Sequence, residues 1–224
     1  MSNNYIVRQL VTIGITSLLL TSTTIVLAEY KPPRGQRPPS GRTTTTGSRG
    51  GCETNSETYL KLLAPQKHVG QTASIRPTFA WFVPDSKPLP IEFKLYKYDD
   101  KGEPQLQQQF LMQSKYGIMS LSLPKNKPSL KVGKRYLWQV VILCYPDQPA
   151  NNLVAMAEID VVKMPAQVRM QRDDQANVDI LAEAGLWYDA LGRAIRLGQK
   201  DIIHDLLKNL TALEIIEQPT TLTP

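Results

Sequence analysis

Between Tyr59 and Lys163, apolar and polar residues alternate with a period of two, and Pro and Gly separate the apolar-rich runs. Such alternation is typical of strands with one buried face, and several short strands at regular spacing indicate a β-sandwich or barrel. The pattern predicts seven strands, at 60–64, 72–83, 91–98, 105–113, 117–123, 134–145 and 153–163. Seven strands in about a hundred residues favour an immunoglobulin-like sandwich.

Aromatic residues recur on the predicted inner faces of these strands, with Trp81 in the second one. The run 130–140 resembles the fibronectin type III signature, in which a Leu-x-x-Gly-x-x-Tyr motif enters a strand. The resemblance implies that Tyr136 forms a tyrosine corner with the backbone a few residues upstream and that Trp138 lies in the core. A different use of these aromatic residues is an exposed platform for carbohydrate.

Beyond Pro165 the apolar period changes to 3.6 residues, which is typical of amphipathic helices. Apolar stripes end at Gly185 and Gly198, so we expect a helical hairpin of two to three helices within 166–218, followed by a disordered tail at 219–224. Short helices draw their stability mainly from tertiary contacts, so this region should pack on the sandwich or, alternatively, on a partner. Its net charge of −3 opposes the +4 of residues 52–165.

The most distinctive short motif is Gly185-Leu-Trp187-Tyr188-Asp189-Ala-Leu191. It resembles half of a tetratricopeptide repeat, in which a Gly and a Tyr precede an Ala at a tight helix crossing. Asp189 has two readings: an exposed ion pair with Arg193 four residues later, or a buried contact between helix and sandwich.

The N-terminal 28 residues resemble an export signal. A polar, positively charged start is followed by an uncharged run from Gln9 to Ala28 that ends in Val-Leu-Ala. This pattern predicts a secretory signal peptide at 1–28, cleaved after Ala28, and hence a periplasmic or secreted protein. The alternative is an uncleaved N-terminal membrane anchor, which the many Thr and Ser residues of the run disfavour.

Residues 29–51 carry five basic residues, one acidic residue, four Pro and five Gly, and almost nothing apolar. Such a composition predicts a disordered linker. The linker holds +4 of the chain's net charge of +6, so the sandwich and helices are close to neutral and a nucleic-acid-binding domain is disfavoured. We expect a spacer that makes at most weak electrostatic contact with anionic envelope polymers.

The chain has two cysteines, Cys52 at the start of the sandwich and Cys144 at the end of its longest predicted strand. An exported protein meets an oxidising compartment, so a Cys52–Cys144 disulfide is expected. The two histidines, His68 and His204, are isolated in the sequence, and no familiar catalytic or phosphate-binding motif occurs. We therefore expect no catalytic residue, cofactor or metal ion.

Taken together, the ordered motifs resemble a cyanobacterial family of secreted proteins known as domain of unknown function nine-two-eight. The resemblance covers residues from about 52 to 218 and rests most on the Gly185–Leu191 motif. It implies a compartment and a bacterial source but no reaction, and family members tend to lie near large secreted or repeat-containing proteins.

The sequence favours an exported, non-enzymatic binding or assembly module of the cell envelope, with an envelope protein as its partner. A glycan- or peptidoglycan-binding sandwich and an envelope hydrolase with an unfamiliar site are the alternatives. Burial of the tryptophans would argue against a glycan platform, and a deep cavity with converging polar groups would favour a hydrolase.

Overall fold

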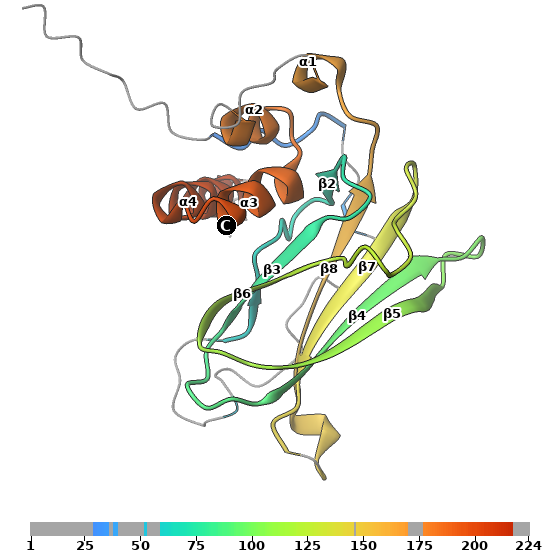
Figure 1. Ribbon diagram of the computed structural model, residues 1–224, viewed down its shortest axis with the longest axis vertical. Helices are drawn as coiled ribbons and strands as arrows, with labels where there is room; N and C mark the ends of the chain where they lie inside the picture. Colours follow the sequence, from blue (N-terminus) through green and yellow to red (C-terminus); the bar gives the residue numbers. More distant parts are fainter. Residues whose placement is uncertain are drawn as a thin grey trace, which may run out of the picture.

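Two β-sheets and a group of helices make up the protein, whose computed structural model describes residues 29–35, 38, 39, 52, 59–145, 147–169 and 177–216 (Figure 1). The three-stranded sheet has the order β1-β3-β6 and contains β1 (Lys61–Leu62), β3 (Thr78–Val83) and β6 (Gly117–Ser122). The five-stranded sheet has the order β2-β8-β7-β4-β5 and contains β2 (Gly70–Thr72), β4 (Pro90–Tyr98), β5 (Pro104–Gln113), β7 (Arg135–Ile142) and β8 (Leu153–Val161).

The core lies between the two sheets. Alternate residues of β4 point inward, and Phe93 is fully buried against Phe79 and Trp81 of β3, with ring centroids 5.0 and 6.0 Å away. Period-two alternation thus places one face of each strand in a shared aromatic core. The predicted mainly β sandwich followed by helices is confirmed.

One predicted strand, 72–83, is wrong as a single element. Its first part, β2, pairs in parallel with β8, whereas β3 pairs with β1 and β6 in the other sheet. Between them the Thr72 hydroxyl accepts the N–H of Ser74 at 3.0 Å, and the Ser74 hydroxyl accepts the N–H of Arg76 at 3.1 Å. These side-chain bonds replace ladder hydrogen bonds, and Pro77 has no N–H to donate. The chain therefore crosses between sheets here.

Four helices follow the sandwich: α1 (Ala166–Arg169), α2 (Asn177–Glu183), α3 (Trp187–Arg196) and α4 (Lys200–Ile216). They lie beside β2 and β3, whereas the connection between β7 and β8, with a short 3-10 helix at Pro149–Asn151, lies at the opposite end (Figure 1). None of the described helices is long and apolar enough to cross a membrane. The predicted signal peptide at 1–28 and tail at 219–224 fall outside the described residues.

Residues 29–33, which we call the strap, pack against the helices. The Tyr30 side chain is 1% exposed, and its ring meets that of Trp187 edge-on at a centroid distance of 4.9 Å. The backbone N–H of Tyr30 donates to Asn209 Oδ1 of α4 at 3.1 Å. The prediction of a disordered linker over 29–51 is therefore wrong for its first residues, because one aromatic side chain supplies the buried surface that the composition otherwise lacks.

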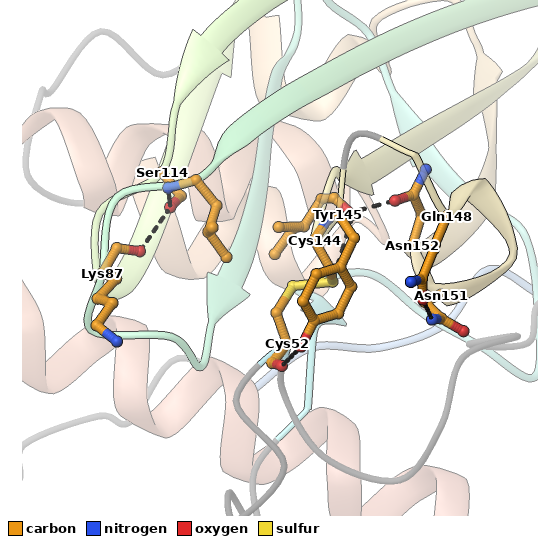
Figure 2. Close-up of a disulfide and its surroundings, with 10 residues drawn as sticks. Cys52, Lys87, Ser114, Cys144, Tyr145, Gln148, Asn151 and Asn152 are labelled. Carbon is orange, nitrogen blue, oxygen red and sulfur yellow. Dashed lines mark hydrogen bonds between the residues drawn. A yellow bond between two sulfur atoms is a disulfide. The ribbon is translucent and has the colours of Figure 1, made fainter.

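A disulfide joins Cys52 to Cys144 just after β7, with a Cα–Cα distance of 5.2 Å. Figure 2 shows the ring of Tyr145 beside this bond, and its hydroxyl donates to the Cys52 carbonyl at 3.2 Å. The backbone N–H of Cys144 donates to Asn152 Oδ1 at 3.2 Å. The predicted disulfide is confirmed, and a bond of this kind indicates an oxidising, extracytoplasmic compartment.

Candidate functional site

Helix α3 is held to the sandwich by the two aromatic residues of the distinctive motif. The Tyr188 hydroxyl accepts the indole N–H of Trp138 at 2.9 Å and donates to the carbonyl of Glu158 at 3.1 Å. The indole N–H of Trp187 donates to the Leu63 carbonyl at 2.9 Å. Both side chains are buried, and burial raises the pKa of Tyr188 far above its ordinary value. The motif therefore positions α3 and exposes no aromatic surface.

The other aromatic residues singled out in the sequence also lie inside. Trp81 and Trp138 are 0% exposed, and the Tyr136 hydroxyl accepts the N–H of Lys131, five residues upstream, at 3.0 Å. With Trp187 equally buried, no tryptophan of the chain can serve as a carbohydrate platform. The glycan-binding alternative therefore loses the side chains on which it rested.

Gly185 forms the turn between α2 and α3. Its φ of 77° lies in the left-handed region, and a Cβ here would sit 2.6 Å from Pro33 Cγ of the strap. The N–H of Lys31 donates to the Ala182 carbonyl at 3.1 Å just before this turn. Glycine is thus required both by the backbone and by the close approach of the strap.

Asp189 makes the contact between helix and sandwich that was one of its two predicted roles. Its Oδ2 accepts the N–H of Ala73 at 2.9 Å. Burial raises the pKa of Asp189, while interactions with Thr72, Ala73 and Ser74 oppose the rise. The carboxylate fixes the start of the segment that crosses between the sheets.

A cavity of about 330 Å³ opens beside Asp189, between α3 and the crossing segment. Arg76 of that segment and Arg193 and Arg196 of α3 line it, and we call them the arginine cluster. Asp189 is the one acidic residue among the described residues that line the cavity. Basic side chains therefore outnumber acidic ones among the described residues that line the cavity.

Two members of the arginine cluster are held by neutral acceptors. Arg76 Nη1 donates to the Pro124 carbonyl, and Arg196 Nη1 donates to Thr78 Oγ1 at 3.5 Å. Neither forms an ion pair within the part of the chain that the structure describes. These contacts orient the two guanidinium groups, and no described carboxylate neutralises them, which suits recognition of a carboxylate or phosphate.

Residues 44–217 match a family described as Domain of Unknown Function (DUF928). The chain belongs to this family. No curated protein matches the DUF928 chain. Among solved structures it is similar to a lytic polysaccharide monooxygenase important for utilization of chitin in Cellvibrio japonicus. That similarity has 12% identity and a TM-score of 0.27 over 45% of this chain and 58% of the other, and it carries no argument about function.

Sequence reasoning about the DUF928 chain missed the arginine cluster as a unit. Asp189, Arg193 and Arg196 are spaced i, i+4 and i+7, which places them on one face of α3. That spacing was visible, but it was interpreted only as a pair of Asp189 with Arg193. Arg76 is more than a hundred residues away in the sequence, so only the fold brings it to the same cavity.

The two histidines lie apart from this site. His68 is buried, and its Nε2 shares a hydrogen bond of 2.8 Å with the Tyr30 hydroxyl of the strap. His204 is exposed on α4 beside an apolar groove. No group of three or more His, Cys, Asp or Glu side chains suited to a metal ion occurs among the residues described.

Proposed function

We propose that the protein is an exported, non-enzymatic binding module of the bacterial cell envelope, and that the cavity beside α3 holds an anionic group of its partner. The observation that carries this proposal is the convergence of three arginines from two distant segments on one cavity of about 330 Å³. Cavities of this size that hold a few placed charged groups are typical binding sites.

The arrangement of charged side chains at the cavity supports binding better than it supports hydrolysis. Asp189, the one acid among the described lining residues, already accepts a hydrogen bond from the backbone of Ala73. A general base needs a lone pair aimed at the substrate, and this carboxylate is directed at the protein instead. The arginines can bind an anion but offer no nucleophile.

Export is the other part of the proposal. The N-terminal pattern predicts cleavage after Ala28, and the disulfide agrees with an oxidising compartment. Cleavage there would leave Glu29 as the first residue, directly before the buried Tyr30. The cleaved chain would thus begin with the strap, which packs against its own helices.

The test uses the chain from Glu29 to Pro224 with its disulfide intact. Inorganic phosphate and isolated envelope polymers, including peptidoglycan, are titrated against it at low and high salt. We expect Arg76→Gln and Arg196→Gln to weaken the binding of both probes about tenfold each, since a hydrogen bond to a charged group contributes roughly 1.5–3 kcal/mol.

Lys101→Gln is the matched control, because it removes one positive charge from an exposed turn far from the cavity. If binding persists in the arginine variants but disappears at high salt, it is assigned to the basic residues of 34–51 and not to the cavity. Equal losses in Lys101→Gln and the arginine variants, or no binding of either probe, would contradict the proposal.

A further inference from the structure

The cavity beside α3 has walls of two kinds. Besides the arginine cluster, the cavity is lined by Met164, Val168 and Leu181, which we call the apolar wall. Val168 and Leu181 are nearly buried, and Met164 is partly so. A site for a bare inorganic anion needs no such wall, so the cavity suits a ligand with both an anionic and an apolar part.

Leu181 of the apolar wall and Arg196 of the arginine cluster lie near opposite ends of α3. Leu181 is next to the start of α3, since its carbonyl accepts the N–H of Leu186 at 2.9 Å. Arg196 is the last residue of α3, and it bonds Thr78, two residues beyond Arg76. Asp189 and Arg196 are seven positions apart, about 10 Å along the helix, so the lining of the cavity extends along most of α3.

We propose, on the basis of the anion-binding function above, that the ligand is the C-terminal residue of a peptide with an apolar side chain. The terminal carboxylate binds Arg76 and Arg196 of the arginine cluster, because planar guanidinium groups match a carboxylate in two-pronged geometry. The side chain packs on the apolar wall, which excludes water from it. The cavity is too small for a folded partner, but about 330 Å³ holds one residue and its peptide bond.

The Ser74 hydroxyl is a further polar group in the lining of the cavity. The Ser74 hydroxyl accepts the backbone N–H of Arg76, and within the described chain its own hydrogen has no protein acceptor. It is therefore oriented by the loop and still able to donate to the carbonyl of the ligand's last peptide bond. Asp189 holds the same loop through the N–H of Ala73, so the donor is fixed before the ligand arrives.

The experiment compares four small probes by calorimetry on the disulfide-bonded chain 29–224. N-acetyl-leucine carries both parts, N-acetyl-glycine has only the carboxylate, N-acetyl-leucinamide has only the apolar side chain, and inorganic phosphate is a bare anion. We expect N-acetyl-leucine to bind at least about tenfold more tightly than N-acetyl-glycine, since burying a leucine side chain supplies that factor. The amide should show no measurable binding.

Two variants assign each part to its wall. Arg196→Gln should weaken both carboxylates about equally. Met164→Ala should reduce the preference for leucine over glycine several-fold and leave N-acetyl-glycine unchanged. Met164 is partly exposed, so this change removes cavity surface with little risk to folding.

The outcomes separate this inference from the proposed function. If phosphate and both carboxylates bind with similar affinity, the peptide inference is overturned while anion binding stands. If no anion binds at all, both are overturned. Preference for N-acetyl-leucine that Met164→Ala leaves intact would also contradict the inference, because the side chain would then contact some other surface.

Discussion

The Tyr188 hydroxyl is one buried polar group that ties α3 to two strands. It accepts the indole N–H of Trp138 on β7 and donates to the backbone carbonyl of Glu158 on β8. Its ring also meets that of Phe79 on β3, with centroids 5.9 Å apart, so the residue contacts both sheets. A buried donor that loses its acceptor costs its full desolvation free energy.

Tyr188→Phe should therefore destabilise the protein more than the loss of one ordinary hydrogen bond. The change keeps the ring but leaves the N–H of Trp138 without this acceptor and removes the hydroxyl that donates to the carbonyl of Glu158. We expect the free energy of unfolding to fall by roughly 1–3 kcal/mol, measured by urea denaturation. Tyr116→Phe is the control, because Tyr116 is 67% exposed and its hydroxyl can bond water. A loss of stability of similar size in Tyr116→Phe would contradict the stabilising role of the buried Tyr188 hydrogen bonds.

At this scale the sequence identifies residue types better than their partners. The motif around Tyr188 was recognisable from its own residues, but Trp138 lies 50 positions away and Glu158 lies 30. Tyr136 shows the contrast, since its partner Lys131 is local and was expected from a short signature. A local pattern can predict a local bond, whereas a contact across the core depends on how the sheets assemble.

At the scale of elements, the sequence predicted the strands and helices better than the segments that connect or cover them. Alternation and helical periodicity predicted most strand and helix positions, because each pattern reports which face is buried. They failed at 73–77, where side-chain hydroxyls end one strand and the chain changes sheets. They also failed at Tyr30, since a single aromatic residue gives no periodic signal.

Gly185→Ala should release the strap, and Gly198→Ala provides a matched control. Both glycines have positive φ, at 77° and 66°, so alanine adds backbone strain of about 1 kcal/mol at either position. At Gly198 nothing lies within 4 Å of the new Cβ, whereas at Gly185 the Cβ would clash with Pro33. The excess loss of stability in Gly185→Ala over Gly198→Ala measures this clash.

Hydrogen exchange gives the local measurement for the same pair. The N–H of Lys31 bonds the carbonyl of Ala182, so its exchange should accelerate in Gly185→Ala far more than in Gly198→Ala. Equal acceleration in both variants would mean that the strap does not depend on the space at Gly185.

At the scale of the whole molecule, the helices and the sandwich share one core. The indole of Trp187 reaches the carbonyl of Leu63, and the N–H of Leu63 in turn donates to the carbonyl of Ala80 on β3 at 2.9 Å. Trp81 and Trp138 complete the same cluster of buried side chains. The two parts have opposite net charge in the sequence, but the contacts that join them are mainly aromatic rings and hydrogen bonds of these rings.

The disulfide should therefore stabilise both parts together, although it touches only the sandwich. Cys52 and Cys144 are 92 residues apart, and closing a loop of that length stabilises the folded state by up to about 4 kcal/mol in the chain-entropy model. We expect the double variant Cys52→Ser/Cys144→Ser to unfold at a lower denaturant concentration, with tryptophan fluorescence and far-ultraviolet circular dichroism still changing in one shared transition. Reduction of the native chain should give the same shift. If the helical signal were lost at a different denaturant concentration from the tryptophan signal, α3 would unfold separately from the sandwich. That result would contradict the shared core that the contacts of Trp187 and Tyr188 describe.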